Sequence, residues 1–325
     1  MALFKKRLIE RVSPEMQQRM RGVRLWIVSS AFFLNEVWVI LQERKSPGIF
    51  EELKLPLRVI KYFGLLALIF CVFRQKALMA SLLIAWFHRV DDVVDGDSPL
   101  PQVWTARMYR DQKRSLLAVA ARGDDAQDLL FEDLMLLGSF EVGRILSMSV
   151  ADEAISVWEV MEWGCERQEN KTLVSRDELL RQTAKQDRAV LRIAAKMFGG
   201  DIARYDVIAE GFTGVLTRTD WLDDIPEDLP RGVVNIPAEA FSQYGVELDA
   251  IASCNNWTEL MRNTSFARWY HDEVLRSQSE WQQFRDLLGD NFGNVFTSRL
   301  KSRIFSWMTV RLLERQFRRI AVRVT

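Results

Sequence analysis

The stretch AWFHRVDDVVDGD, residues 85–97, decides how this part of the chain can fold, because an apolar helical segment ends there in a group of carboxylates. On a helix, Asp91 and Asp95 lie one turn apart on the same face, and Asp92 lies beside them. Like charges at this spacing repel one another. Mg²⁺ would remove the repulsion, since it binds one or two protein carboxylates together with water and substrate phosphates. By itself, the pattern is equally compatible with a solvated helix end.

A second acidic stretch, DWLDDIPED at residues 220–228, follows another long helical segment. Its carboxylates belong to Asp220, Asp223, Asp224, Glu227 and Asp228. Because the C-terminal end of a helix disfavours anions, two acidic helix ends are costly unless cations bind there. The two stretches therefore predict two walls of carboxylates that face one another across a cavity and hold a cluster of about two or three Mg²⁺ ions.

The expected chemistry follows from this metal cluster. The ions would bind a diphosphate and stabilise its negative charge as it leaves an allylic carbon. An apolar pocket would hold the remaining hydrocarbon and exclude water from the carbocation. The predicted catalytic residues are Asp91, Asp92, Asp95, Asp224 and Asp228, and the predicted metal ligands are Asp91, Asp92, Asp95, Asp220, Asp224, Glu227 and Asp228.

The rest of the sequence indicates helices almost everywhere. Apolar residues recur at helical spacing, whereas the alternation of a half-buried strand is rare. One helix, for example, begins with Ser175 and Glu178 in the pattern of a capping box and ends before Gly199. We therefore predict a single-domain, all-α helical bundle around a central cavity at residues 56–325, preceded by an N-terminal helical extension at residues 1–55.

Composition and charge exclude several classes of protein. Apolar residues make up 48% and charged residues 27% of the 325 residues, which is typical of a soluble globular protein. The 44 basic and 44 acidic side chains balance, so no nucleic-acid partner is expected. The three cysteines lack metal-ligand or CxxC spacing and are expected to stay reduced, which favours a cytoplasmic location.

Apolar segments raise the question of membrane contact. Residues 25–41 contain polar side chains and residues 62–73 are too short to cross a bilayer, so we interpret both as buried helices. Residues 299–323 mix apolar side chains with eight Arg or Lys. Such a helix could bind an anionic membrane surface peripherally, or it could pack as a terminal helix on the core.

The two acidic stretches resemble the motifs of squalene and phytoene synthases. Residues 80–96 look like the first aspartate-rich motif of that family, including Arg89 just before the acidic residues. The family's second motif is DxxED followed by a basic residue, a glycine and Leu-Pro, and residues 224–237, which contain Arg231, are similar to it. The resemblance extends over about residues 60–315.

This resemblance implies an isoprenoid synthase helical bundle, Mg²⁺-dependent ionisation of an isoprenyl diphosphate substrate, and head-to-head joining of two such substrates. The predicted function is therefore that of a squalene/phytoene synthase-like prenyltransferase. A class I terpene cyclase that acts on one prenyl diphosphate is the alternative enzyme. A non-catalytic helical assembly or binding protein is the alternative of a different class.

Four arginines are candidate contacts to the diphosphate: Arg89, Arg107, Arg188 and Arg231. Arg107 follows the first motif but could equally be exposed. Arg188 shares one helical face with Arg181, Lys185 and Arg192, and together they form a basic stripe. A stripe that faces the cavity could bind a second diphosphate, whereas one that faces outward is a solvated surface.

The chain also departs from the family's pattern. The family usually has small residues, Ala-Gly-x-Val-Gly, in a helix between the motifs, where the substrate approaches the backbone. Residues 182–191 stand at that place, and Asp187 and Arg188 would fill or polarise the space. Near the second motif, Asp223 and Asn235 replace an expected arginine and an expected tyrosine. These changes affect the second-substrate site and the rearrangement step more than the metal-dependent ionisation.

Overall fold

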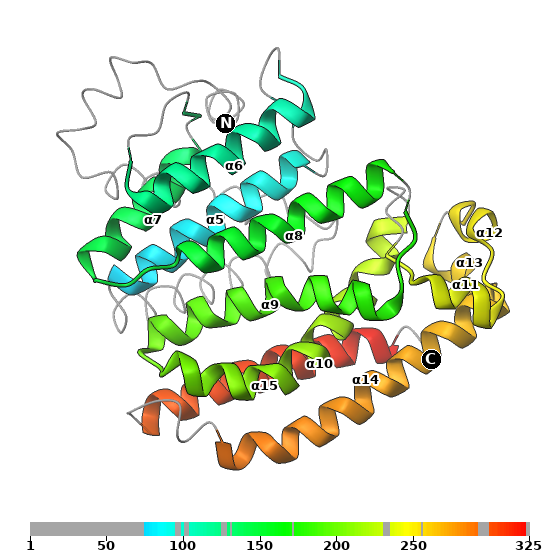
Figure 1. Cartoon of the computed structure of the whole chain (residues 1–325). Coiled ribbons are helices and arrows are strands. Elements are labelled where there is room, and N and C mark those ends of the chain that lie inside the picture. The colour runs from blue at the N-terminus through cyan, green and yellow to red at the C-terminus, as the bar shows by residue number, and fades with distance from the viewer. Residues whose placement is uncertain are drawn as a thin grey trace, which may run out of the picture. The chain divides into compact units, whose positions relative to one another are not determined.

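The computed structural model describes residues 75–94, 99–100, 104–124, 129–130, 132–170, 172–229, 235–254, 256–291 and 299–322. Within these ranges the regular elements are helices, which confirms the predicted all-α class (Figure 1). The predicted N-terminal extension and the apolar segments at residues 25–41 and 62–73 lie outside the described residues. None of the described helices has both the length and the apolarity that crossing a membrane requires.

The chain divides into two compact units, Met1–Trp158 and Glu159–Thr325. The described helices of the first unit are α5 (Gln75–Val94), α6 (Ala106–Arg122), α7 (Asp133–Ile145) and the first part of α8 (Ala151–Glu169). The second unit contains the rest of α8 and α9 (Arg176–Phe198), α10 (Ile202–Asp228), α11 (Ala238–Tyr244), α12 (Leu248–Ala252), α13 (Trp257–Arg262), α14 (Thr264–Asn291) and α15 (Arg299–Val322).

In the first unit, α5 packs along α7, and α6 also contacts α7. The buried apolar residues of α5 are spread over its whole length: Ala77, Leu78, Met79, Ala80, Leu82, Leu83, Trp86, Val90 and Val93. The hydroxyl of Ser139 on α7 donates to the backbone oxygen of Met79 at 2.9 Å. A Cβ on Gly143 would lie only 2.7 Å from the backbone oxygen of Met148, so the turn after α7 requires glycine there. Close packing thus holds the helix that carries the first acidic stretch.

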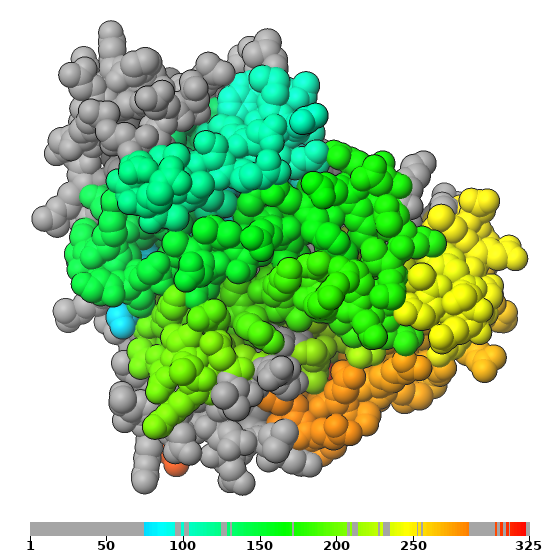
Figure 2. All heavy atoms as spheres, viewed as in Figure 1, coloured from blue at the N-terminus to red at the C-terminus, as the bar shows by residue number. Residues whose placement is uncertain are grey.

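The centre of the second unit is the pair of helices α9 and α10. Ser175 caps α9 by accepting a hydrogen bond from the backbone nitrogen of Glu178 at 3.2 Å, and Gly199 ends the helix with a φ of 74°, as predicted. α10 packs along α9 and also lies against α14 and α15. The short helices α11 and α13 pack on α14, and together with α12 they form the yellow group in Figure 2. The second acidic stretch therefore ends a helix that is packed on several sides.

Pro226 lies inside α10, close to its C-terminal end. Because proline has no backbone N–H, it cannot bond the carbonyl oxygen of Leu222, four residues earlier. The hydroxyl of Tyr270 on α14 donates to this oxygen at 3.2 Å and satisfies the buried acceptor. α10 continues to Asp228 in spite of the proline.

Candidate active site

The first acidic stretch lies at the C-terminal end of α5. Asp91 and Asp92 are exposed there, whereas Val90 and Val93 are buried on the inner side of the helix. Asp95, the third predicted ligand of this stretch, lies outside the described residues. The apolar residues thus anchor the helix end and leave two carboxylates facing solvent.

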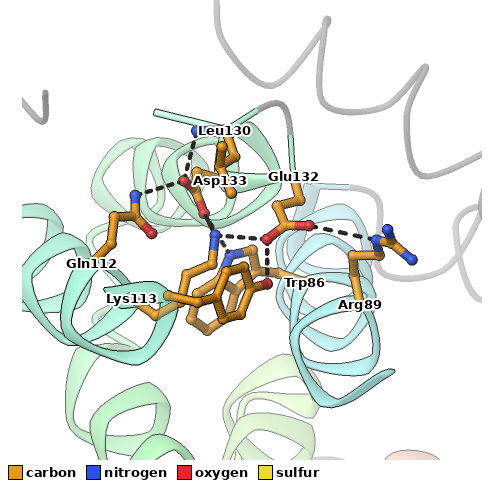
Figure 3. A network of polar contacts seen from close by, with 8 residues as sticks. Trp86, Arg89, Gln112, Lys113, Leu130, Glu132 and Asp133 are labelled. Atoms are coloured by element: carbon orange, nitrogen blue, oxygen red, sulfur yellow. Dashed lines mark hydrogen bonds and ion pairs between the residues drawn. The ribbon is translucent and has the colours of Figure 1, made fainter. Parts of the chain in front are cut away.

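A buried network of charged residues lies beside this helix end (Figure 3). Its centre is Lys113 of α6, whose side chain is 0% exposed. The ammonium lies 2.6 Å from Oε1 of Glu132 and 2.5 Å from Oδ1 of Asp133, and both carboxylates are fully buried. A buried lysine without such partners would be strongly unfavourable. The two carboxylates therefore make the burial of Lys113 tolerable.

Neutral side chains complete the bonding of these carboxylates. Oδ2 of Asp133 accepts hydrogen bonds from Nε2 of Gln112 and from the backbone nitrogen of Leu130, each at 2.9 Å. The hydroxyl of Tyr109 donates to Glu132. Burial and the charge of Glu132 raise the pKa of Tyr109 well above its usual value, so the phenol stays protonated and remains a donor.

Arg89 connects this network to α5. Its side chain is only 7% exposed, and Nε lies 3.5 Å from Oε2 of Glu132. In Figure 3 the remaining nitrogens of the guanidinium point away from Glu132. Arg89 and Lys113 together balance Glu132 and Asp133, so the network has no net charge. It holds Arg89, a predicted diphosphate contact, in one place just before Asp91.

The other predicted arginines lie differently. Arg107, on the first turn of α6, is 87% exposed and lies 3.8 Å from Asp111. Arg188 of α9 is exposed, as are Arg181 and Lys185 of the basic stripe. Arg192, the fourth member of the stripe, is half-buried, and all four side chains lie on a helix of the second unit. Arg231 lies outside the described residues.

The carboxylates of the second acidic stretch, at the end of α10, have distinct environments. Asp223 is buried and forms an ion pair with Arg319 of α15 at 2.6 Å. Asp220 is half-buried and accepts a hydrogen bond from Nε2 of Gln316. Burial and the charge of Asp223 raise the pKa of Asp220 to about 6, while Arg319 lowers it. Asp224 is exposed. Asp223 is therefore paired with a cation, whereas the hydrogen-bond donor to Asp220 is a neutral amide.

Asp228, the last residue of α10, is bonded from the segment that follows the helix. Nδ2 of Asn235 donates to Oδ2 of Asp228 at 2.5 Å, and Oδ1 of Asn235 accepts from Arg167 of α8. Burial lowers the pKa of Arg167, and the nearby charge of Asp228 opposes this shift. The indole Nε1 of Trp221 donates to the backbone oxygen of Asn235. The side chain of Glu227 lies outside the described part of the structure.

A second ionic cluster holds α10 through Arg218. Nη1 of Arg218 lies 2.7 Å from Glu273, and its Nη2 lies 2.9 Å from Glu280. Arg176, at the start of α9, lies 2.5 Å from the same Glu273, which is fully buried. These contacts join α9, α10 and α14 just before Asp220.

Asp187 of α9 lies against α10 near the second acidic stretch. Its carboxylate accepts a hydrogen bond from the hydroxyl of Thr217. Burial raises the pKa of Asp187 to about 7; the hydrogen bond from Thr217 lowers it, and the charge of Asp220 raises it further. The residue that stands where the family usually has small side chains is therefore a poorly compensated carboxyl.

No group of three or more His, Cys, Asp or Glu side chains in the described ranges is arranged to hold a metal ion. Two predicted ligands, Asp95 and Glu227, are outside that search. The chemistry of the remaining donors fits Mg²⁺, because each stretch offers only carboxylate oxygens and the ion takes one or two of them.

Several residues that shape the site were not singled out in the sequence. Lys113, Glu132 and Asp133 lie in helical patterns whose polar positions are ordinarily exposed, so nothing in the pattern marks them as buried. Gln316 and Arg319 lie in the basic C-terminal segment, far from the acidic stretch in sequence. Asn235 stands where the family has a tyrosine, and this departure marked the position as unusual. The sequence did not predict that Asn235 would bond Arg167 and Asp228.

Comparisons with known proteins agree with the predicted fold and family. A family model described as squalene/phytoene synthase matches residues 67–323. The crystal structure of squalene synthase HpnC from Alicyclobacillus acidocaldarius is similar over 78% of this chain and 88% of that chain, with 16% identity and a TM-score of 0.52. A search of curated proteins finds no significant match. The likeness to HpnC confirms the all-α isoprenoid synthase fold, and the family match covers most of the chain. The chain therefore belongs to the squalene/phytoene synthase family.

Proposed function

We propose that this protein is a Mg²⁺-dependent prenyltransferase that ionises isoprenyl diphosphates and joins two of them head to head. Membership of the family supports the transfer of isoprenyl groups as the general chemistry. The observation that carries the proposal is the placement of carboxylates at the C-terminal ends of both α5 and α10. The backbone carbonyls at such ends already repel anions, so this placement is costly unless the carboxylates bind cations.

The expected ligands of the Mg²⁺ ions are Asp91, Asp92 and Asp95 from the first stretch and Asp220, Asp224, Glu227 and Asp228 from the second. When bound, about two or three Mg²⁺ ions would supply the positive charge that a departing diphosphate needs. Asp223 is excluded from this set because Arg319 already neutralises it.

Arginines would bind the diphosphate alongside the metal. Arg89 is the best placed, since Glu132 holds its Nε and the rest of the guanidinium points away from the network. A guanidinium stabilises a diphosphate by charge and by paired hydrogen bonds and needs no proton transfer. Arg231 is expected to act in the same way, whereas the exposed Arg107 and Arg188 would contribute less.

The products formed from prenyl diphosphates test the proposal. Purified protein with Mg²⁺ is incubated with prenyl diphosphates of different chain lengths, and released diphosphate and hydrocarbon products are measured. A product with twice the carbon count supports head-to-head joining. A product with an unchanged carbon count supports the terpene cyclase instead. Release of no diphosphate from any substrate would overturn both enzymes and favour the non-catalytic binding protein.

A pair of variants assigns the activity to the acidic stretch. We expect Asp91→Asn combined with Asp92→Asn to lower diphosphate release by about 100-fold or more, because charge stabilisation of the leaving group is lost. Glu159→Gln on α8 is the matched control, since Glu159 is also an exposed carboxylate on a helix. Wild-type turnover in the double variant would contradict the assignment.

Cyclisation of one substrate has a specific observation in its favour. Asp187 brings a carboxyl to the part of α9 where the family usually has small residues, and it packs against Thr217 of α10. A carboxyl at that place would restrict a second hydrocarbon chain. We therefore expect Asp187→Gly to shift products toward the doubled carbon count if the wild-type enzyme cyclises one substrate.

α15 supports peripheral contact with a membrane surface. Its inner face is buried through Leu313 and Ile320, so the helix packs on the core. On its outer face, Trp307 is 60% exposed, and the guanidinium of Arg311 lies 6.0 Å from the centre of its ring. Three further arginines of this helix are exposed: Arg303, Arg315 and Arg318. A Trp among cations suits an anionic lipid surface. Sedimentation with anionic vesicles but not with neutral ones would support this contact, and equal sedimentation would overturn it.

A further inference from the structure

We propose that two carboxamides, those of Gln316 and Asn235, position the two end carboxylates of the second acidic stretch, Asp220 and Asp228. The inference deepens the proposed function, on which it rests, by naming what orients two of the expected metal ligands. Both carboxamides lie outside the acidic stretch, and each donates a hydrogen bond to one carboxylate.

Gln316 reaches Asp220 from α15. Its side chain is buried, and Nε2 donates to Oδ1 of Asp220. Oε1 faces the hydroxyl of Thr219 at 3.4 Å. Thr219 is fully buried, and backbone oxygens of its own helix, those of Val215 and Leu216, lie closer to its one hydroxyl proton. The buried amide of Gln316 therefore turns its donor side toward the carboxylate.

Asn235 reaches Asp228 from the segment after α10. Its Oδ1 accepts from the buried guanidinium of Arg167, and its Nδ2 donates to Asp228 at 2.5 Å. A guanidinium can only donate and a carboxylate can only accept, so a single orientation of the amide satisfies both partners. The backbone oxygen of Asn235 is itself fixed by the indole of Trp221. The bridge from Arg167 to Asp228 is therefore directional and has little freedom.

A neutral donor orients a carboxylate without removing its charge. Asp223 illustrates the contrast, because its partner Arg319 neutralises it at 2.6 Å and makes it a poor ligand for a cation. Asp220 and Asp228 instead receive an uncharged amide N–H, which leaves each negative charge available to Mg²⁺. Hydrogen-bond partners of metal ligands typically change metal affinity or activity by about 10–100-fold when they are removed.

Binding of Mg²⁺ and inorganic diphosphate to the full chain tests the positioning role. The probe is the rise in unfolding temperature as Mg²⁺ is added at a fixed concentration of inorganic diphosphate. We expect Asn235→Leu and Gln316→Met, which keep the volume and remove the hydrogen bonds, to raise the Mg²⁺ concentration at half-maximal shift by about 10-fold or more. A merely structural role would lower the unfolding temperature without Mg²⁺ and leave this midpoint unchanged.

Asn256→Ala is the matched control. The carboxamide of Asn256 donates to the carboxylate of Glu259 at 3.0 Å and caps α13, and Glu259 is not one of the expected metal ligands. Its loss should lower stability and leave the Mg²⁺ midpoint as in the wild type. If Asn235→Leu or Gln316→Met does not fold, Asn235→Ser and Gln316→Asn, which shorten the donor, are measured in the same way and should also raise the midpoint.

The outcomes separate this inference from the proposed function. Wild-type Mg²⁺ midpoints in the folded Asn235 and Gln316 variants would overturn the positioning role. A wild-type protein that binds Mg²⁺ and diphosphate but releases no diphosphate from prenyl substrates would overturn the proposed function and leave the positioning test valid. A wild-type protein whose unfolding temperature does not respond to Mg²⁺ would overturn both.

Discussion

The C-terminal ends of α5 and α10 both carry aspartates, but the surroundings of these aspartates differ. At α5, a buried network in which Arg89 and Lys113 pair with Glu132 and Asp133 lies beside the helix end, while Asp91 and Asp92 are exposed. At α10, Asp223 is buried, Asp220 and Asp228 are half-buried, and Asp224 is exposed. Asp223 is neutralised by Arg319, and Asp220 and Asp228 receive amide donors.

The difference shows that an acidic motif does not determine its own electrostatics. Beneath the end of α5, the charges of Arg89 and Lys113 balance those of Glu132 and Asp133. At the end of α10, burial and the charge of Asp223 raise the pKa of Asp220 to about 6. We infer that the second stretch depends more on a bound cation than the first.

Removing the cation at the centre of the first network should have the largest effect. Lys113→Met would leave Glu132 and Asp133 buried without their shared partner, and breaking such a pair costs about 3–5 kcal/mol. Unfolding by urea, followed by circular dichroism, measures the change. Lys185→Met is the control, since Lys185 is exposed and should change stability by less than about 0.5 kcal/mol. A loss below about 1 kcal/mol for Lys113→Met would contradict the stabilising role of Lys113 in the first network.

The stability of the second unit should depend on pH, because Asp187 of α9 is a buried carboxyl with a raised pKa. The carboxyl of Asp187 has a pKa of about 7 when folded and about 3.8 ordinarily, so between these values the folded state binds more protons than the unfolded state. The contribution of Asp187 to the free energy of unfolding is therefore fully present below pH 3.8 and is lost as pH rises through about 7. Its size is at most about 4 kcal/mol.

Asp187→Asn isolates this contribution. Asparagine can still accept the hydrogen bond from Thr217, but it does not titrate. In Mg²⁺-free buffer, the wild type should lose more stability than the variant between about pH 5 and pH 8. Parallel pH curves for the two proteins would show that Asp187 has an ordinary pKa and would contradict an uncompensated carboxyl at this place.

The end of α10 should also depend on the hydroxyl that replaces the bond lost at Pro226. Tyr270→Phe would leave the carbonyl oxygen of Leu222 buried without its donor, at a cost of about 1–3 kcal/mol. Tyr244→Phe is a suitable control, because the hydroxyl of Tyr244 bonds the half-buried Asp272 away from the acidic stretch. Equal changes in urea unfolding for the two variants would argue against a special role of Tyr270.

Local sequence patterns predicted the helices but not the residues that bond the acidic side chains. Ser175, Gly199 and the acidic helix ends are encoded within a few residues, so capping and periodicity identify them. The partners of the acids come from much further along the chain: Gln316 is 96 residues from Asp220, and the bridge from Arg167 to Asn235 spans 68. Helical periodicity contains no information on which distant helices meet.

The contacts of Lys113 could not be predicted from the sequence for a different reason. A lysine at a polar position of an amphipathic helix is ordinarily exposed, and the pattern of α6 gives no sign of the opposite. Its burial depends on two adjacent acids at the start of α7, which a reading of α6 alone would not include. Buried ion pairs are set by the packing of several elements, so they become visible only in the structure.

The smallest effect is expected at the surface of the first unit. Arg107 and Asp111 form an exposed pair at 3.8 Å on α6, where solvent screens the attraction. Arg107→Ala should therefore change the free energy of unfolding by less than about 0.5 kcal/mol, and the change should shrink further in about 1 M salt. Comparing the loss of stability with that of Lys113→Met, about two turns further along α6, shows how much more a buried ion pair contributes than an exposed one. A change above about 1 kcal/mol that persists in high salt would mean that Arg107 is part of the buried network and not of the surface.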